Sequence, residues 1–269
     1  FAQALPEVKA LEGLAGRDRL TMLPAAVAAL VRAISAQSGF TRLNKLAGDI
    51  LVFAPRIGDV KAITDAVNNL SLGIEVFPCH AQLDDKAYAA YKESDKAAEQ
   101  AMSEGRPTKP QRVIVATTYA ETSVTMSNLR YVIDSGMILQ PVWDPETCST
   151  KPEVRWHSQD GCKQRKGRVG RVQDGECFRL YTKAEHDEFP VHTPPEITRV
   201  PLDTFFLKAK ATGIDDLASF DWLGKSQDVA ASDRKEIERA SEILRKRGAL
   251  DDDGDITHRG IELDGFRTD

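Results

Sequence analysis

The sequence predicts a doubly wound α/β domain, built on a parallel sheet, that is followed by a small helical module. Three observations predict the α/β domain: short apolar runs typical of strands buried on both faces, amphipathic stretches between them, and turn residues at their boundaries. The runs are Asp49–Ala54, Gly73–Phe77, Val113–Ala116 and Tyr131–Ile133. Such sheets bind ligands at the carboxyl ends of their strands. Four residues follow those ends and are the first candidates for chemistry: Arg56, Ala81, Thr117 and Asp134.

The other elements follow from hydrophobic spacing and turn residues. Apolar positions at three- and four-residue steps predict a helix over Met22–Ile34, with Pro24 in its first turn and an irregular lead-in over residues 1–20. Asp59 is expected to cap the helix that carries Val60 to Leu70. The domain is completed by a helix over Leu83–Met102, a hairpin that pairs 138–142 with 154–156, and a strand over Glu176–Tyr181.

A proline-rich linker precedes the C-terminal module. Helices are predicted over Leu202–Ala211 and Ser232–Lys246, with Ser232 as a cap, and an acidic turn over Asp251–Asp255 between two short strands. A helix followed by a small hairpin is typical of a winged-helix module. We therefore expect three parts: a lead-in and packing helix (1–47), the α/β domain (48–195), and the linker with the winged helix (196–269).

Composition excludes several classes of protein. A net charge of −5 and a pI near 5.7 argue against a protein that coats nucleic acid through bulk charge, so any polyanion contact needs a local patch. No apolar run approaches the roughly 18 residues of a membrane span, and no signal peptide is evident. The four cysteines form no CxxC pair, which argues against a zinc site and favours reduced thiols inside the cell.

A local basic patch occurs at Lys163–Arg171, where five of nine residues are Lys or Arg. Arg168 and Arg171 are three residues apart, so on a helix they would share a face. A glycine precedes each of them, which would let the backbone approach a phosphate closely, and the guanidinium fork suits phosphate oxygens. The alternative is a solvated basic helix face.

Several segments in register resemble the DEAH-box helicases of superfamily 2. Ala116–Thr125 with Tyr131–Gly136 is similar to motif V of that family, and Gln164–Arg171 to its motif VI, QRxGRxGR. Gly175–Thr182 is similar to the family segment that follows motif VI. Gly213–Leu217 and Gly248–Asp251 are similar to the linker and winged helix of the same family. The resemblance runs from about Gly48 to the C-terminus and implies a second RecA-like domain plus a winged helix.

The resemblance implies roles for individual residues. ATP would bind between two RecA-like domains, with Arg168 and Arg171 as arginine fingers and Gln164 positioning the attacking water or the phosphate. The implied contacts to the nucleic-acid backbone are Arg56, Thr117 and Thr118. The residues implied to couple the two sites are Glu121, Ser123 and Thr125. The hairpin over 138–157 resembles the strand-separating hairpin of the family.

The sequence departs from the family pattern at several positions. Thr118 stands where the family usually has Asn, and Ser127 where it often has an Asp that contacts the nucleotide ribose. Lys166 and Val169 replace alanines. Tyr91 is the candidate for the aromatic that stacks on the base, with an ordinary packed tyrosine as the alternative. Ser127 and Tyr91 thus complete the expected nucleotide contacts.

Half of an ATPase is missing from the sequence. There is no G-x-x-x-x-G-K-[ST] loop, and Gly224-Lys225-Ser226 only imitates its end. Asp187-Glu188-Phe189 cannot replace a DExH box, so we expect no metal site. The resemblance implies that Mg²⁺ is held mainly by the N-terminal RecA-like domain. His80 is expected to contact a phosphate or to pack, and His157 and His186 to be surface or structural residues.

The sequence therefore predicts the C-terminal half of an ATP-dependent RNA helicase that turns over little or no nucleotide by itself. Its expected partners are single-stranded RNA, the N-terminal RecA-like domain of the same protein and activating proteins, with no membrane. The expected location is intracellular: the cytoplasm, the nucleus, or the host cytoplasm for a viral protein. Two alternatives stay open: a non-hydrolysing module that binds RNA or proteins, and an unrelated α/β domain with a basic helix.

Overall fold

The computed structural model describes residues 5–40, 48–105, 111–121, 126, 128–144, 149–170, 174–194, 202–214 and 230–265. The chain divides into two compact units. The first comprises Phe1–Gln140 with Glu153–Thr193, and the second comprises Pro141–Pro152 with Pro194–Asp269. Each unit is described by itself.

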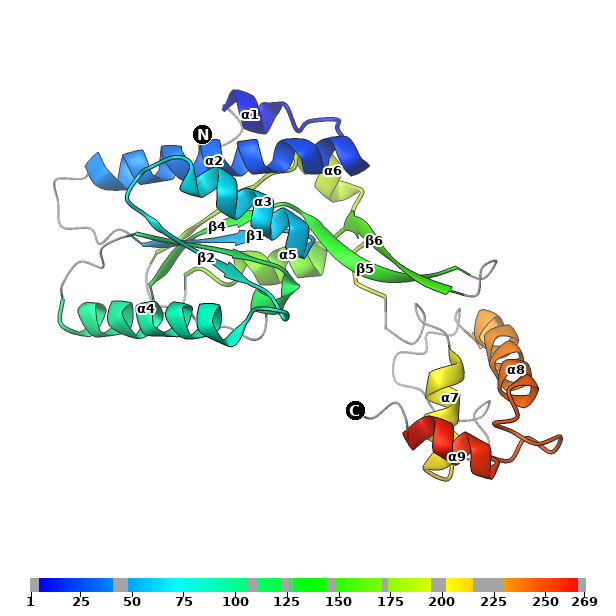
Figure 1. The fold of residues 1–269 in the computed structure, drawn as a ribbon. Helices are drawn as coiled ribbons and strands as arrows, with labels where there is room; N and C mark the ends of the chain where they lie inside the picture. Colours follow the sequence, from blue (N-terminus) through cyan, green and yellow to red (C-terminus); the bar gives the residue numbers. More distant parts are fainter. Residues whose placement is uncertain are drawn as a thin grey trace. The chain divides into compact units, whose positions relative to one another are not determined.

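The first unit is built on a five-stranded, all-parallel sheet (Figure 1). The strand order is β2 (Glu75–Cys79), β3 (Arg112–Ala116), β1 (Asp49–Phe53), β4 (Leu129–Asp134) and β7 (Glu176–Arg179). Phe53 is in register with both Ala116 and Asp134, so the carboxyl ends of the three central strands meet at one edge. The predicted α/β class is confirmed, and the sheet with its flanking helices fits a RecA-like fold.

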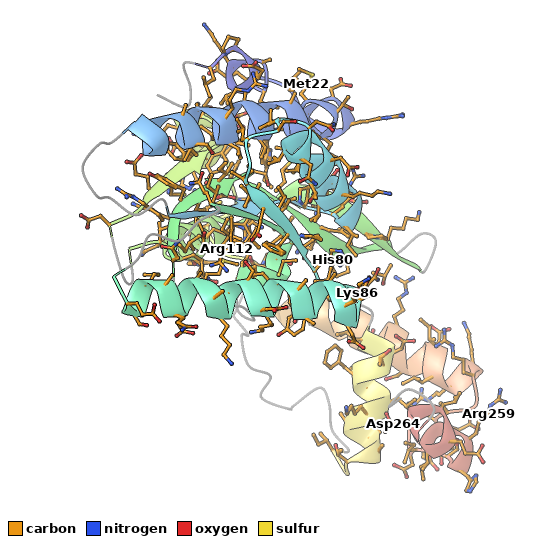
Figure 2. The ribbon with its side chains drawn as sticks, turned by 60° about the vertical axis from the view of Figure 1, so that its left-hand side comes forward. Met22, His80, Lys86, Arg112, Arg259 and Asp264 are labelled. Carbon is orange, nitrogen blue, oxygen red and sulfur yellow. The ribbon has the colours of Figure 1, made fainter. Side chains whose placement is uncertain are left out.

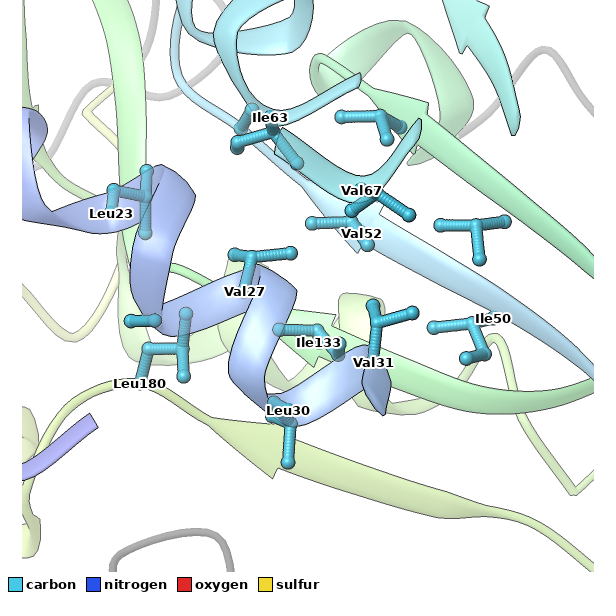
Figure 3. Close-up of a cluster of buried hydrophobic side chains, with 14 of the residues drawn as sticks. Leu23, Val27, Leu30, Val31, Ile50, Val52, Ile63, Val67, Ile133 and Leu180 are labelled. Carbon is cyan, nitrogen blue, oxygen red and sulfur yellow. The ribbon is translucent and has the colours of Figure 1, made fainter. Parts of the chain in front are cut away.

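Helices cover both faces of this sheet (Figure 1). α2 (Gly16–Phe40) and α3 (Ile57–Asn68) lie on one face, and α4 (Asp85–Ser103) and α5 (Gln159–Lys166) on the other. Side chains of a strand alternate between faces. Ile50 and Val52 accordingly enter the core beneath α2 and α3, which Figure 3 shows, whereas Leu51 and Phe53 enter the opposite core. Burial on both faces explains the apolar runs Ile50–Phe53 of β1 and Val113–Ala116 of β3.

The start of α2 differs from the prediction. The helix begins at Gly16, after a short α1 (Pro6–Lys9), so Pro24 lies inside it rather than in its first turn. The buried guanidinium of Arg19 donates to the carbonyls of Leu11, Leu14 and Leu180 and to Glu185, and lies 4.6 Å from the Trp156 ring centroid. Because Arg19 is a charged residue at a core-facing position, it interrupts the apolar spacing, and the first turns of α2 could not be predicted from that spacing.

α2 is also apolar enough over Gly16–Ala36 to cross a membrane, judged by length and composition alone. In the folded chain its apolar face is buried. Leu23, Val27, Leu30 and Val31 are at most 1% exposed and pack against the sheet (Figure 3). Each such side chain contributes roughly 1.5–3 kcal/mol through burial.

One ion pair lies at the beginning of β1 and a second at the start of α3, the helix that follows it. At the beginning of β1, Asp49 accepts from Arg112, which also donates to Asp95 at 3.1 Å and so ties the sheet to α4. Figure 2 shows the position of Arg112 between the sheet and α4. Beyond the end of β1, α3 begins at Ile57 with Arg56 as the N-cap residue, and Asp59 lies in the first turn. Asp59 therefore pairs with Arg56 and is not the cap that the sequence predicted.

The predicted hairpin is confirmed as β5 (Met137–Asp144) paired with β6 (Ser149–Trp156). Its tip, residues 145–148, lies outside the described residues. After β7, α6 (Lys183–Asp187) starts with a capping box formed by Thr182 and Glu185.

The second unit contains α7 (Leu202–Ala211), α8 (Ala230–Lys246) and α9 (His258–Gly265). The first two helices were predicted, although α8 begins before Ser232, so this residue is not its cap. In place of the two short strands predicted around the acidic turn, the described residues form only an isolated antiparallel bridge between Leu250 and Ile256, and the turn between them is exposed, as expected. α9 was not predicted: it is only eight residues long and mostly polar, and the hydroxyl of Thr257 accepts from Gly260 at its start. The winged-helix assignment stays a prediction.

Candidate functional site

The predicted nucleic-acid contacts lie along the carboxyl edge of the sheet. Thr117 follows β3 and its backbone N–H donates to Cys79 of β2 at 3.1 Å, which continues the sheet by one residue. Thr118 is exposed and opens η2 (Thr118–Glu121), a single 3₁₀ turn. The parallel register places this turn beside the end of β1. Both threonines therefore lie at the edge where α/β sheets bind ligands, with Thr118 exposed and Thr117 half-buried, its Oγ1 accepting from the N–H of Tyr119 at 3.4 Å.

Arg56 lies at the same edge and is oriented by Asp59. Its Nε and Nη2 each donate to one carboxylate oxygen at 2.8 Å, and its side chain is 45% exposed. This hydrogen bonding raises the pKa of Arg56. A two-point pair fixes the guanidinium plane while leaving Nη1 outside the pair. The arrangement fixes the direction of the guanidinium group at this edge.

The basic stretch differs from the prediction in its backbone. α5 ends at Lys166 with Gly167 as its C-cap, so Arg168 lies in the turn beyond the helix and not on a helical face. Its N–H donates to the carbonyl of Arg165 at 3.1 Å. Gly170 has a φ of +81°, a conformation that a side chain would strain, so this glycine serves the turn itself. Gln164 is exposed on α5 and Arg168 is half-buried.

Arg165, which the sequence did not single out, connects these segments. Its side chain is fully buried at 0% exposure. Nε donates to Glu121 of η2 at 2.7 Å, and Nη1 donates to Asp134 at the end of β4 at 2.8 Å and to the carbonyl of Met137 in β5 at 3.2 Å. The guanidinium also lies 4.7 Å from the centroid of the Phe53 ring. One side chain thus joins η2, the sheet edge, the hairpin and α5.

Asp134 is the most buried acid of this cluster. Its second oxygen accepts from the hydroxyl of Tyr181 at 2.9 Å, and its first also accepts from the N–H of Gly136. Burial alone would raise the pKa of Asp134, but the charge and hydrogen bonds of Arg165 outweigh it and hold the pKa below its usual range. The same competition, with His157 and Arg165 opposing burial, lowers the pKa of Glu121. Both carboxylates are therefore ionised and paired.

Tyr91 does not occupy the place expected of a stacking aromatic. Its side chain is 1% exposed and packs edge-on against Phe77, with ring centroids 5.9 Å apart, in the core beneath α4. The prediction that it stacks on a base is wrong, because the ring has no face open to a ligand. His157 was expected at the surface or in a structural role, and it is 6% exposed beside Glu121.

Four predicted site residues lie outside the described part of the chain: Ser123, Thr125, Ser127 and Arg171. Within the described residues, no group of three or more His, Cys, Asp or Glu side chains is placed to hold a metal ion. The described edge therefore offers cations and hydroxyl groups, which suit phosphates, but no ligand set for Mg²⁺.

Comparison with known proteins gives a consistent result. Residues 27–173, more than half of the chain, match the family model described as "Helicase conserved C-terminal domain". A DEAH-box ATP-dependent helicase sequence of Mycosarcoma maydis is 32% identical over 253 residues, which cover 91% of this chain and 15% of that one. The human protein named "Probable ATP-dependent RNA helicase DHX34" is 32% identical over 219 residues, 80% of this chain and 18% of that one.

A solved structure shares the fold. The Escherichia coli DExH-box NTPase HrpB superposes with a TM-score of 0.67 at 23% identity, over 91% of this chain and 27% of that one. The chain thus spans less than a fifth of the two sequence relatives above.

Proposed function

The chain belongs to the helicase C-terminal domain family, in its DEAH-box branch, and on this premise we propose that it is the second RecA-like domain, followed by a winged helix, of an ATP-dependent RNA helicase. The observation that carries the proposal is the junction at Arg165. It joins η2, which follows Thr117 and opens with Thr118, to α5, which carries Gln164 and is followed by Arg168. A helicase requires such a link, because nucleotide and RNA sites must respond to one another.

In this proposal the chain supplies half of an ATP site. Arg168 and Arg171 reach phosphate bound on the preceding RecA-like domain of the same protein and stabilise charge as the phosphoryl group transfers to water. Gln164 positions the water or the phosphate, and Ser127 is the candidate contact to the ribose. ATP is the cofactor, and any Mg²⁺ is held mainly by the preceding domain. The chain alone hydrolyses little or none.

The RNA side is formed by backbone contacts. Thr117, Thr118 and the oriented Arg56 bind phosphates of a single strand without reading its sequence. Glu121, with Ser123 and Thr125, transmits the state of one site to the other. The hairpin β5–β6 separates strands ahead of the RNA channel. We assign residues 48–195 to the RecA-like domain, with α2 packed on it, and 196–269 to the linker and winged helix.

RNA-stimulated ATPase activity of the full-length protein tests this proposal. We expect hydrolysis that rises with added single-stranded RNA. Thr117→Ala should lower the stimulated rate more than the basal rate, because it removes a backbone contact at the RNA side. Thr21→Ala, an exposed threonine on α2, is the matched control.

Two results would oppose the proposal. Equal loss of the basal and the RNA-stimulated ATPase rates in Thr117→Ala would contradict the assignment of Thr117 to RNA binding and of other residues to hydrolysis. RNA binding without any hydrolysis by the full-length protein would favour the non-hydrolysing module instead.

A helicase of this kind acts inside the cell, in the cytoplasm or nucleus, or in the host cytoplasm if it is viral. Activating proteins are its expected further partners.

A further inference from the structure

His157 is held in a defined orientation at the base of the hairpin, directly after β6. Its backbone N–H donates to the carbonyl of Gly136 at 2.7 Å. Its ring Nδ1 accepts from the N–H of Ser158 at 2.9 Å, so Nε2 is the ring nitrogen that carries a proton. Nε2 lies 3.2 Å from Oε1 of Glu121, the same oxygen that accepts from Arg165. The tautomer therefore directs a positive edge toward that carboxylate.

The contact to Glu121 is electrostatic and not a well-aligned hydrogen bond. Nε2 is buried and has no properly directed acceptor among the described residues, although it is within ion-pair distance of Oε1. Burying a polar group in this way costs free energy that an apolar side chain would avoid. Core packing alone therefore does not account for a histidine here, whereas a role toward Glu121 does.

Gly161 makes room for this ring. A Cβ atom at Gly161 would lie 2.0–2.5 Å from three atoms of the imidazole, closer than any real contact. Gly161 is in the first turn of α5, where it donates its N–H to the capping hydroxyl of Ser158 at 3.1 Å. The imidazole thus occupies space at α5 that every other residue type at position 161 would fill, so His157 and Gly161 act as a pair.

We propose that His157 is a positioning residue that holds the carboxylate of Glu121 against Arg165, so that the hairpin, η2 and the turn carrying Arg168 change position together. This inference rests on the proposed function and adds the hairpin to the link between the nucleotide and RNA sites. Met137 supplies the first connection from the hairpin, through its carbonyl to Arg165. His157 supplies the second, from the other strand of the hairpin. With both strands attached, movement of the hairpin is transmitted to Glu121.

The test separates a polar role from packing. In the full-length protein, His157→Leu keeps an apolar filling but removes the N–H, whereas His157→Gln places an N–H donor near the position of Nε2. We expect His157→Leu to lower the ratio of RNA-stimulated to basal kcat by about tenfold, and His157→Gln to stay within about threefold of wild type. His258→Leu is the matched control, because this histidine also faces a carboxylate but is 89% exposed in the second unit.

A second measurement needs neither ATP nor RNA. Amide hydrogen exchange of residues 118–121 should accelerate by about tenfold in His157→Leu and in Gly161→Ala, and stay near wild type in His157→Gln. Equal protection in the Leu and Gln variants, with equal kcat ratios, would show that the ring only fills space and would overturn the proposal. If the wild-type protein lacked ATPase activity altogether, the proposed function would fail while hydrogen exchange still decided the role of His157.

A double-mutant cycle completes the test. If His157 acts through Glu121, then His157→Leu should change the kcat ratio little in a Glu121→Gln background, because the carboxylate that it positions is already gone. Additive effects of the two substitutions would contradict that pathway.

Discussion

Replacing Arg165 by Met tests the junction at the sheet edge directly. Met has a similar length and apolar stem but no charge, so it removes the hydrogen bonds to Glu121, Asp134 and Met137 with little change in volume. Arg165 and Asp134 are both at 0% side-chain exposure, and Glu121 is at 12%. The substitution therefore leaves two acids without their cation, one of them with no access to water.

The expected cost follows from that burial. Breaking a buried ion pair by removing one partner costs about 3–5 kcal/mol, because the remaining charge stays buried. Tyr181 and the N–H of Gly136 still donate to Asp134, which argues for the lower half of this range. Adding Asp134→Asn to Arg165→Met should recover part of the loss, since it removes the uncompensated charge.

The assay is urea unfolding of the chain followed by circular dichroism, with amide exchange in β1 and β4 to assign the loss to the first unit. Arg155→Met is the matched control: its pair with Glu153 is about half exposed, and its loss should cost less than about 1 kcal/mol. If Arg165→Met were as stable as Arg155→Met, the interpretation of Arg165 as the central connection would be refuted.

Two further predictions concern RNA affinity and acid stability. Arg56→Ala should weaken RNA binding by the full-length protein. It should also reduce the slope of log K against log salt by about 0.7, which corresponds to the loss of one single-strand phosphate contact. The exposed Arg17→Ala control should leave the slope unchanged, and an unchanged slope in Arg56→Ala would exclude the contact. Because the pKa values of Glu121 and Asp134 are lowered on folding, their stabilisation is complete above the usual values of 4.5 and 3.8 and is lost as pH falls through the folded-state values. The urea concentration at the unfolding midpoint should therefore decrease as the pH is lowered below about 4.5. The decrease should be less steep in Arg165→Met. Parallel pH profiles of the wild type and this variant would contradict the assignment.

The strands were predictable from sequence because their environment is uniform. β1 and β3 are buried on both faces, so every residue from Ile50 to Phe53 and from Val113 to Ala116 is apolar and the run itself identifies the strand. The position of the candidate site could be inferred from the same fact, since the carboxyl edge of a parallel sheet is fixed once the strands are known.

Local patterns failed where tertiary contacts decide the structure. A helical period suggested one face for Arg168 and Arg171, but Gly167 ends α5 before Arg168. The first turns of α2 were hidden because Arg19, a charged residue, is buried among carbonyl groups.

The Arg165 junction could not be predicted for a related reason. Its carboxylates, Glu121 and Asp134, are 44 and 31 residues away in the sequence, and no spacing rule links them to Arg165. Tyr91 gave the opposite error, since an aromatic on a polar helix looks exposed in sequence while its ring is in the core.

The most direct test of the central claim is single-turnover ATP hydrolysis by the full-length protein with Arg168→Ala, with the protein in excess over ATP and at saturating RNA. The account predicts a rate lower by about 10³-fold, because a cation that stabilises phosphoryl transfer is lost. The matched control Arg17→Ala, an exposed arginine on α2, should hydrolyse like wild type. Hydrolysis at the wild-type rate in Arg168→Ala would contradict the assignment of this segment to the ATP site.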